Sequence, residues 1–587
     1  MSHFTPNNPN NDIDKVIELV CNPKYLEGSE KHRDAMARIA GTLKTDDEHF
    51  NRCLEILRDQ RFLPGGRIQS SIGAAKQTTA FNCYVSGTIE DSRRGIFRRL
   101  EEAAETMGLG GGDGFDFSPI RPRGTLIKSQ GSGASGPVSY MDVYNAMCAT
   151  IASAGNRRGA MMGTLRVDHP DIEEFIDAKR TPGRLTNFNI SVLVTDDFMA
   201  AVEMDEEFVL QFNGIPYKTV RAKALWDKIM RSNWSYAEPG VLFIDRINEK
   251  NNLWYCETIC ATNPCGEQPL PPHGACLLGS FNLTKYIVPL YTTSEDILHI
   301  SEQDGWKFDW ELFIRDIEQI VPMMDNVIDN TIYPLEEQAE EAQAKRRMGL
   351  GVTGVANAAE VLGYRYGSSE MLEWLEVVMG VLRDYCYGAS IALAKVKGPF
   401  PKFDAEMFLA SGFARTLPDW IREEIKLYGI RNSHLLSIAP TGTISLFAGN
   451  ISSGIEPPFS LEYTRNTIMD DGSIKAWNVM DYAYDQWGIK GKTSDELTAE
   501  EHIDVLNLAS RYVDSACSKT CNVGEDVTFE QFKELYRKAY DGGSSGCTTY
   551  RPAAAANRGA VLEKKKTEEE GGMCVIDPLT GERSCAD

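Results

Sequence analysis

The 587-residue chain lacks any run of eighteen apolar residues, so the sequence predicts no membrane-spanning helix. Its start, Met1 to Asp14, is rich in Asn and Pro and has neither the basic nor the apolar stretch of a secretory signal. Basic residues are fewer than acidic ones, 61 against 84, which gives a net charge of −23. A surface this anionic repels nucleic-acid backbones. We therefore expect a cytoplasmic protein that binds neither nucleic acid nor membrane.

Two common nucleotide-binding loops are also missing from the sequence. No Gly-x-x-x-x-Gly-Lys-Ser/Thr segment occurs, and Gly108-Leu109-Gly110-Gly111-Gly112 does not complete the pattern Gly-x-Gly-x-x-Gly. These absences exclude P-loop and Rossmann proteins. A small nucleotide could still be held by local arginines and by backbone N–H groups.

Helical and strand-like segments alternate along the chain, which indicates an α/β architecture. Residues 12–61 and 310–400 carry apolar side chains at helical spacing. Residues 62–282 contain short apolar runs separated by Gly, Pro and Asn, as strands joined by loops do. The run 435–439 is a candidate buried strand that leads into a polar loop. We divide the chain into a helical N-terminal region (1–61), an α/β barrel (62–556) and a flexible tail (557–587).

Four of the fourteen cysteines, Cys256, Cys260, Cys265 and Cys276, are close in the sequence. They lack the Cys-x₂-Cys spacing with which structural zinc sites usually start, so we expect no resident metal. A non-catalytic, zinc-stabilised nucleotide-binding protein stays open as an alternative. Four others are expected to be buried small hydrophobic residues, as free cysteines often are: Cys21, Cys53, Cys148 and Cys386.

The segment Asn263-Pro264-Cys265-Gly266-Glu267 places an amide, a thiol and a carboxylate at alternate positions. In an extended loop such side chains point the same way. We therefore expect them to face one substrate as hydrogen-bond donor, radical or nucleophile, and general base. A cysteine nucleophile for acyl transfer normally needs a histidine base, and of the 8 histidines only His273 is nearby, which disfavours a hydrolase.

This segment resembles the finger-loop signature of ribonucleotide reductase catalytic subunits, and other segments resemble the same family in the same order. They are Phe81-Asn82-Cys83, Gly110-Gly111-Gly112-Asp113-Gly114, Gly159-Ala160-Met161-Met162, His169-Pro170-Asp171-Ile172, Ala275-Cys276, Pro440-Thr441-Gly442-Thr443-Ile444-Ser445 and Gly454-Ile455-Glu456-Pro457. The resemblance covers about residues 60–560.

The resemblance implies a ten-stranded α/β barrel, built from two five-stranded parallel halves, with Cys265 on a loop at its centre. A thiyl radical on Cys265 would remove the 3′-hydrogen of a ribonucleotide. Glu267 would take the 3′-hydroxyl proton and Asn263 would bind the sugar hydroxyls. Cys83 and Cys276 would supply two electrons and end as a disulfide, which requires their Cα atoms to lie about 4.4–6.8 Å apart.

The resemblance also implies two nucleotide sites. Substrate-binding residues would be Asn82, Pro440, Thr441, Gly442, Thr443 and Ser445, because hydroxyls and backbone N–H groups beside a glycine suit a phosphate. A deoxynucleoside triphosphate effector would bind near Asp91, Arg121, Arg157 and Arg158. The alternative for these charged residues is a set of solvated surface ion pairs.

The radical source is predicted from the end of the barrel region. Partner-dependent reductases carry two adjacent tyrosines there, whereas this chain has Gly546-Cys547-Thr548-Thr549-Tyr550-Arg551-Pro552. This form resembles the adenosylcobalamin-dependent class, together with Pro64-Gly65-Gly66-Arg67 and Arg157-Arg158-Gly159-Ala160. A class that needs a separate metal-containing radical subunit remains the nearest alternative. Diphosphate substrates are favoured over triphosphates, and a homodimer is expected.

The tail ends in two cysteines, Cys574 and Cys585, which could re-reduce the barrel disulfide by thiol exchange. A flexible coil from Gly559 to Cys574 has a reach of roughly 20–23 Å. A thioredoxin-like or glutaredoxin-like protein would then reduce the tail. The alternative is an inert chain end with incidental cysteines.

Overall fold

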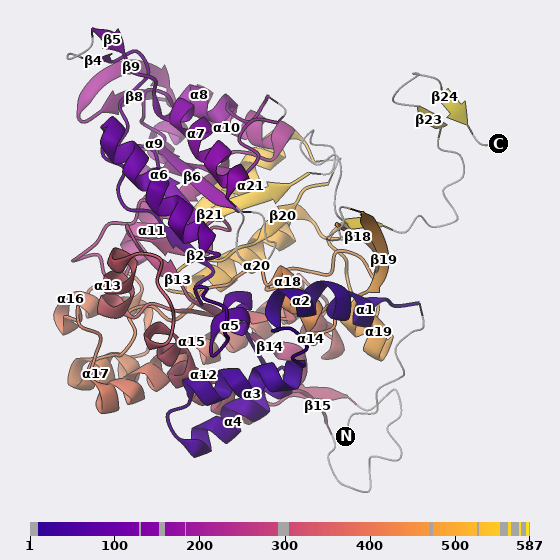
Figure 1. Ribbon diagram of the computed structural model, residues 1–587. Coiled ribbons are helices and arrows are strands. Elements are labelled where there is room, and N and C mark those ends of the chain that lie inside the picture. The colour runs from indigo at the N-terminus through magenta and orange to yellow at the C-terminus, as the bar shows by residue number, and fades with distance from the viewer. Residues whose placement is uncertain are drawn as a thin grey trace, which may run out of the picture.

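The computed structural model describes most of the chain. It covers residues 10–127, 131–151, 159–181, 183–290, 305–468, 473–524 and 527–551, and the backbone of 562–564, 574–576 and 583–585. Helices surround a central set of strands, and short hairpins project from the periphery (Figure 1).

The predicted N-terminal helices are present. They are α1 (Ile13–Val16), the π-helix η1 (Ile17–Cys21), α2 (Asn22–Tyr25), α3 (His32–Leu43) and α4 (Asp47–Arg58). Asp46 caps α4 by accepting a hydrogen bond from the backbone N–H of His49. Helices α3 and α4 pack against each other and against α12 (Trp310–Asp329). Their apolar residues belong to the same buried cluster as the second half of the barrel.

The first half of the barrel consists of five parallel strands. In spatial order they are β2 (Cys83–Val85), β3 (Gly112–Asp116), β6 (Met161–Arg166), β7 (Phe188–Val194) and β10 (Gly240–Phe243). Its helices are α6 (Arg93–Gly108), α7 (Pro137–Thr150), α8 (Ile172–Asp177), α9 (Asp196–Glu203), α10 (Ala222–Tyr236) and α11 (Ile244–Lys250). Two hairpins extend from it, β4 (Leu126–Ile127) with β5 (Ser132–Gly133), and β8 (Glu207–Phe212) with β9 (Ile215–Arg221).

The second half contains β14 (Leu278–Asn282), β17 (Gly349–Thr353), the segment 435–438, β20 (Thr520–Asn522) and β21 (Gly546–Tyr550). All pairings between neighbours in this order are parallel. The predicted strand at 435–439 forms only isolated bridges, at Leu436 and Ile438. The reason is a contact with a residue distant in sequence: the backbone N–H groups of Leu435 and Leu436 donate to the carboxylate of Asp514 instead of to a neighbouring strand.

The two halves are linked at both edges. On one side β10 pairs antiparallel with β21. On the other, β13 (Ala275–Cys276) pairs antiparallel with β2, and the chain continues through Leu277 directly into β14. Each half is parallel within itself, as predicted, and β13 is linked to β14 by the chain and not by strand pairing. The ten segments linked in this way are called the ring.

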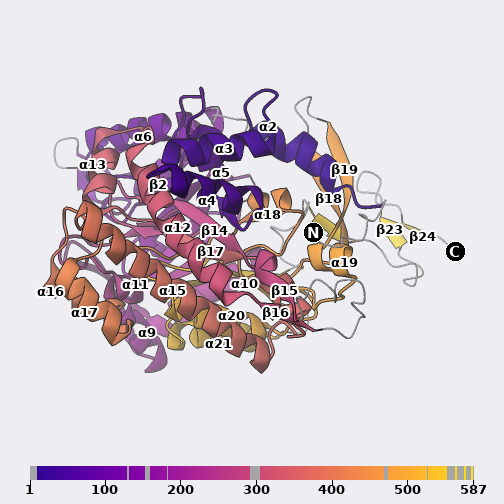
Figure 2. The ribbon, with the colours of Figure 1, turned by 90° about the horizontal axis from the view of Figure 1, so that it is seen from below.

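Helices of varied length cover the second half. They include α13 (Glu336–Lys345), α14 (Val355–Val361), α15 (Ser369–Lys397), α16 (Ala405–Leu409), α17 (Asp419–Tyr428), α18 (Gly442–Phe447), α19 (Tyr482–Trp487), α20 (Ala499–Arg511) and α21 (Phe529–Asp541). The predicted capping box at Thr528 and Gln531 opens α21. Figure 2 shows α12 and α15 running alongside β14 and β17.

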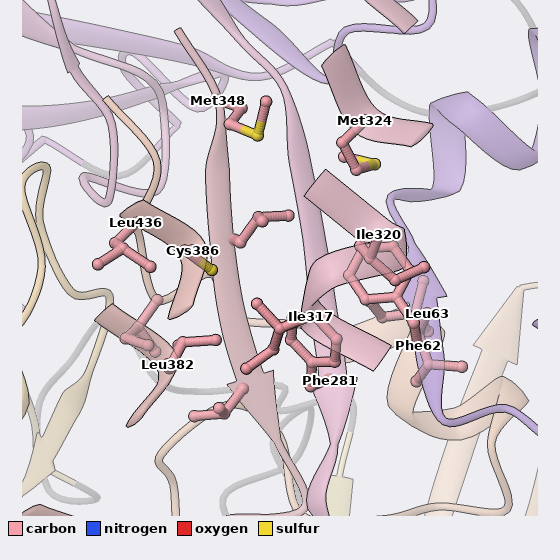
Figure 3. Packing of buried hydrophobic residues seen from close by; sticks show 14 of the residues in the cluster. Phe62, Leu63, Phe281, Ile317, Ile320, Met324, Met348, Leu382, Cys386 and Leu436 are labelled. Carbon is pink, nitrogen blue, oxygen red and sulfur yellow. The ribbon is translucent and has the colours of Figure 1, made fainter. Parts of the chain in front are cut away.

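The core of this half lies between strands and helices. Figure 3 shows Ile317 and Ile320 of α12 close to Phe281 of β14, and Leu382 and Cys386 of α15 near Leu436. All six are buried. Among the described residues, only α15 is long and apolar enough to cross a membrane, and half of its apolar window is buried. It packs against α12, α17 and α20, as a core helix does.

Short elements complete the fold. They are β1 (Phe62–Pro64), α5 (Gly66–Ser71), β11 (Ala261–Thr262), β12 (Pro269–Leu270), η2 (Leu283–Tyr286), β15 (Ile287–Pro289), β16 (Trp306–Phe308), η4 (Ala414–Thr416), β18 (Glu462–Ile468), β19 (Ile474–Met480), β22 (Leu562–Lys564), β23 (Cys574–Ile576) and β24 (Arg583–Cys585).

Candidate active site

A small hairpin carries Cys265. Strands β11 and β12 pair antiparallel, with Thr262 opposite Pro269, so six residues remain for the connecting turn. The turn is tight, because the N–H of Gly266 donates to the carbonyl of Asn263 at 3.1 Å and Gly266 adopts a φ of +83°. The predicted extended loop is therefore wrong: Cys265 lies at the apex of a turn, and Asn263 and Glu267 lie on its two arms.

This hairpin, the finger loop, is threaded between the two halves of the ring. On the first-half side, Thr164 of β6 donates to the carbonyl of Cys260 at 3.1 Å, and Asn189 of β7 donates to that of Pro264 at 2.8 Å. On the second-half side, the carbonyl of Glu267 accepts from the hydroxyl of Ser437 at 2.8 Å. Backbone contact is close, since a Cβ at Gly114 would meet the carbonyl oxygen of Thr262 at 2.0 Å. Both halves thus fix the position of Cys265.

The two predicted redox cysteines are neighbours. Cys83 of β2 and Cys276 of β13 lie directly opposite each other in an antiparallel pair. Such Cα atoms are about 4.5–5.5 Å apart, within the range that a disulfide needs. Burial raises the pKa of the Cys276 thiol well above its usual value, and the nearby Glu267, Cys83 and Cys265 raise it further. The Cys276 thiol therefore keeps its proton at neutral pH.

A first cavity of about 250 Å³ brings together most of the predicted catalytic and substrate residues, but Asn263, Cys276 and Ser445 do not line it. Its wall contains Cys83, Cys265 and Glu267 from the barrel interior. The predicted substrate residues on the wall are Asn82, Pro440, Thr441, Gly442 and Thr443. Cys276 lies behind Cys83, fully buried. The cavity therefore combines three functional groups of the prediction with its proposed phosphate loop.

The phosphate loop leads into α18, and two of its three hydroxyl side chains make hydrogen bonds within the protein. The Thr441 hydroxyl accepts from the N–H of Gly454 at 2.8 Å and lies 3.0 Å from the hydroxyl of Thr353. The Ser445 hydroxyl donates to the carbonyl of Gly442 at 3.2 Å, and Ser445 does not line the first cavity. Both side chains hold the loop, whereas Gly442 has open space above its Cα.

Several buried polar atoms near the site have no hydrogen-bond partner among the described residues. They include the Nδ2 of Asn263, whose Oδ1 accepts from the N–H of Gln268 at 3.0 Å, the Oδ1 of Asn82, and the Nε2 and Oε1 of Gln268. Unsatisfied buried polar atoms are costly, so a ligand with matching groups would be favoured here. A ribose offers hydroxyls that can both accept and donate.

The N-terminal helices add residues that the sequence prediction missed. Lys24 and Tyr25 of α2 line the first cavity, with Arg67 and Ser70 of α5. The Tyr25 ring packs edge-on against Phe447 of α18, with centroids 5.8 Å apart. No motif in residues 1–61 indicated this position, because only the tertiary fold brings α2 to the phosphate loop.

A second cavity of about 370 Å³ lies on the other side of Cys265. Cys265 and Pro440 line both cavities. The wall of the second cavity also includes Asn189, Ser191, Glu238, Gly266, Ser518, Lys519, Thr548 and Tyr550. None of the described residues on it is a histidine. The apex thiol therefore separates two spaces, each large enough for part of a ligand.

The remaining predicted residues fall elsewhere. Asp91 and Arg121 form an ion pair at 2.8 Å, with a third or less of each side chain exposed. Arg157 and Arg158 lie outside the described residues. In the tail, Cys574 of β23 lies opposite Cys585 of β24 in an antiparallel pair.

The four clustered cysteines do not form a metal site. Cys256, Cys260, Cys265 and Cys276 range from exposed to buried, and the described residues contain no group of three potential ligands that could hold a metal ion. The zinc-based alternative thus lacks a site in this part of the chain. Cys21, Cys53, Cys148 and Cys386 are buried, as predicted.

Comparison with known proteins agrees with the geometry. A family model described as "Ribonucleotide reductase, barrel domain" matches residues 81–550. The chain is 34% identical over 556 residues to a vitamin B12-dependent ribonucleoside-diphosphate reductase of Thermoplasma acidophilum, covering 89% of this chain and 68% of the relative. A Mycobacterium tuberculosis protein of the same name is 33% identical, with 89% and 75% covered. A vitamin B12-dependent ribonucleotide reductase of Streptomyces clavuligerus is 26% identical, with 85% and 59% covered.

Proposed function

This chain belongs to the ribonucleotide reductase family, and we propose on that basis that it converts ribonucleotides to 2′-deoxyribonucleotides with adenosylcobalamin as radical source. Two relatives are named as ribonucleoside-diphosphate reductases, which favours diphosphate substrates. The chain is accordingly an oxidoreductase. The observation that carries the proposal is the position of Cys265 between two cavities.

The first cavity is proposed to hold the ribonucleotide. A thiyl radical at Cys265 would take the 3′-hydrogen of the ribose, a C–H bond that acid or base groups cannot break. Glu267, on the same wall, would accept the 3′-hydroxyl proton. The available Nδ2 of Asn263 would donate to a sugar hydroxyl. Loss of the 2′-hydroxyl as water then follows from the acid–base arrangement of these groups.

The phosphates are proposed to bind at the start of α18. There Gly442 is exposed and Thr443 is partly exposed, so their backbone N–H groups would face the phosphates, while the Thr441 and Ser445 side chains hold the loop. Lys24 and Arg67 line the same cavity and add positive charge, which an anionic substrate needs in a protein of net charge −23.

Electrons are proposed to come from Cys83 and Cys276. Each turnover would oxidise the two thiols to one disulfide and pass two electrons and two protons to the substrate, so that one water leaves. The opposed Cα register supports this step. The protonated state of Cys276, which burial favours by raising its pKa, suits a donor of hydrogen rather than a nucleophile.

The second cavity is proposed to receive the adenosyl part of adenosylcobalamin, which supplies the initial radical when bound. Its donor set fits a nucleoside, because Ser191, Ser518 and Thr548 offer hydroxyls. At the apex, an added Cβ at Gly266 would meet no atom within 4 Å, so the space beside Cys265 is open. The lack of a histidine on the described wall agrees with a cofactor that needs no histidine ligand to cobalt.

Further partners extend the proposal. The tail cysteines Cys574 and Cys585 would reduce the barrel disulfide and be reduced in turn by a thioredoxin-like or glutaredoxin-like protein. A deoxynucleoside triphosphate effector would bind near Asp91 and Arg121, in competition with their mutual ion pair. We also propose that the protein forms a homodimer and is located in the cytoplasm.

The proposal is tested by assaying the purified chain with adenosylcobalamin, a ribonucleoside diphosphate and dithiothreitol, without a second protein. We expect deoxynucleotide to form. Cys265→Ser should reduce the rate by about 10³-fold or more, because the hydroxyl O–H bond is too strong to supply the radical under these conditions. Cys260→Ser is the matched control, since Cys260 is on the same finger loop but lines neither cavity.

If the purified chain is inactive with adenosylcobalamin but forms deoxynucleotide once a metal-containing radical subunit is added, the cobalamin assignment is overturned. The reductase assignment then remains intact. Equal activity of Cys265→Ser and the Cys260→Ser control would overturn both.

A further inference from the structure

The hairpin β18–β19 contacts the start of the described chain at one edge and the tail strand β22 at the other. At its β19 edge, the N–H of Asp12 donates to the carbonyl of Asn478 at 2.7 Å, and the N–H of Asn478 donates to the Asp12 carboxylate at 3.0 Å. At its β18 edge, β22 of the tail pairs antiparallel, with Thr464 opposite Glu563. The spatial order of the three strands is β19-β18-β22.

The same hairpin lies beside the phosphate loop. A third cavity, of about 470 Å³, is lined by Tyr463 and Arg465 of β18 and by Gly442 and Thr443. Gly442 and Thr443 also line the first cavity, so the two spaces are neighbours. Figures 1 and 2 both show β18, β19 and α18 on the side of the molecule where α1 and α2 lie.

We propose that β18 is the docking edge for the tail strand β22, and that this pairing delivers the tail dithiol to the mouth of the first cavity. An exposed edge strand presents unpaired N–H and C=O groups that an extended segment can use. The occupant is the tail of the same chain, because β22 already has the register of such a strand. The inference rests on the proposed role of Cys574 and Cys585 as reductants.

Docking changes the effective length of the tether. Without it, the last described barrel residue is Arg551, and Cys574 follows 23 residues later. With β22 docked, the tether is counted from Lys564, and Cys574 follows 10 residues later. Effective concentration falls with about the three-halves power of tether length, so docking raises it roughly three- to fourfold. A coil of ten residues still has a reach of roughly 16–19 Å.

The test is the double substitution Leu562→Pro/Glu563→Pro in the full chain. Adjacent residues of a strand present their N–H groups to alternate sides, so one of the two prolines must remove a bond to β18. The matched control is Glu568→Pro/Glu569→Pro, which stiffens the same tail outside β22. Turnover is measured with a thioredoxin-type protein as reductant and, separately, with dithiothreitol, which can reach the barrel disulfide directly.

We expect the docking variant to lose roughly three- to fourfold or more of its protein-supported turnover, while the control and all dithiothreitol-supported rates stay unchanged. Hydrogen exchange at the β18 amides should quicken in the docking variant only. Equal turnover and equal exchange in the docking variant and control would overturn the inference.

The proposed function of the tail can fail separately. If Cys574→Ser/Cys585→Ser keeps full protein-supported turnover, the tail is not the reductant. If that variant is inactive with protein reductant but the docking variant is not impaired, only the docking inference fails.

Discussion

The barrel and the tail each hold a pair of cysteines on a two-stranded antiparallel ladder, and in each pair the cysteines lie directly opposite each other. The backbone register is the same, but the surroundings differ. Cys83 and Cys276 come from strands 193 positions apart and are fixed in the wall of a ring. Cys574 and Cys585 are 11 positions apart on a short hairpin near the chain end.

Under the proposed function, the same strand register serves two redox roles: reduction of the substrate in the barrel and re-reduction of the barrel pair by the tail. The barrel pair is enclosed by the finger loop and by β3, and the Cys276 thiol is kept protonated because burial raises its pKa. A large protein reductant cannot enter a cavity of about 250 Å³. A second pair on a tether can carry electrons between that cavity and solvent by thiol–disulfide exchange.

The largest expected effect separates the two pairs by reductant. Cys276→Ser should lower turnover by about 10³-fold or more with either dithiothreitol or a thioredoxin-type protein, because in the proposed mechanism the barrel pair donates to the substrate itself. Cys574→Ser should impair turnover only with the protein reductant. Steady-state deoxynucleotide formation with each reductant measures this. If Cys276→Ser retained activity with dithiothreitol, the two pairs would not have the distinct roles assigned here.

An intermediate effect concerns the pH dependence of alkylation. Because burial raises the pKa of Cys276, only a small fraction of this thiol is ionised at pH 8. That fraction continues to rise at pH values where an ordinary thiol is already fully ionised. We expect its iodoacetamide reaction at pH 8 to be slower than that of glutathione, because the thiolate is the reacting species.

Mass spectrometry of the Cys276 peptide at several pH values measures that rate. Steric protection lowers the rate at every pH, whereas the raised pKa moves the midpoint upward. If the pH midpoint of the Cys276 reaction equals that of glutathione, burial does not raise the pKa of this thiol.

The smallest effect tests how tightly the barrel pair is packed. A Cβ at Gly112 would lie 3.3 Å from the sulfur of Cys83 and 3.2 Å from the Cγ of Pro264. Gly112→Ala should therefore shift the sulfur or the finger loop by a few tenths of an ångström and lower turnover about two- to fivefold with both reductants. Gly108→Ala is the control, because an added Cβ there meets no atom within 4 Å. Identical rates in the two variants would show that this contact does not constrain the pair.

Local pattern was enough to predict many elements. Apolar spacing predicted the N-terminal helices, and the Thr528-Gln531 box predicted the start of α21, because caps and periodicity act over a few residues. The strand expected at 435–439 was reduced to isolated bridges by the Asp514 carboxylate, 78 positions beyond Leu436. No local pattern could indicate that competition.

For the site, the sequence by itself determined which chemical groups are available: the Cys265 segment, the two further cysteines and the glycine-containing loop before α18, all recognisable by their order. Only the tertiary structure decided that Cys83 faces Cys276, that the finger loop bends into a tight turn, and that Lys24 reaches the cavity. The physical reason is distance along the chain. Contacts between residues far apart in sequence form only when the strand ring closes and the N-terminal helices pack against it, and no short motif encodes that closure.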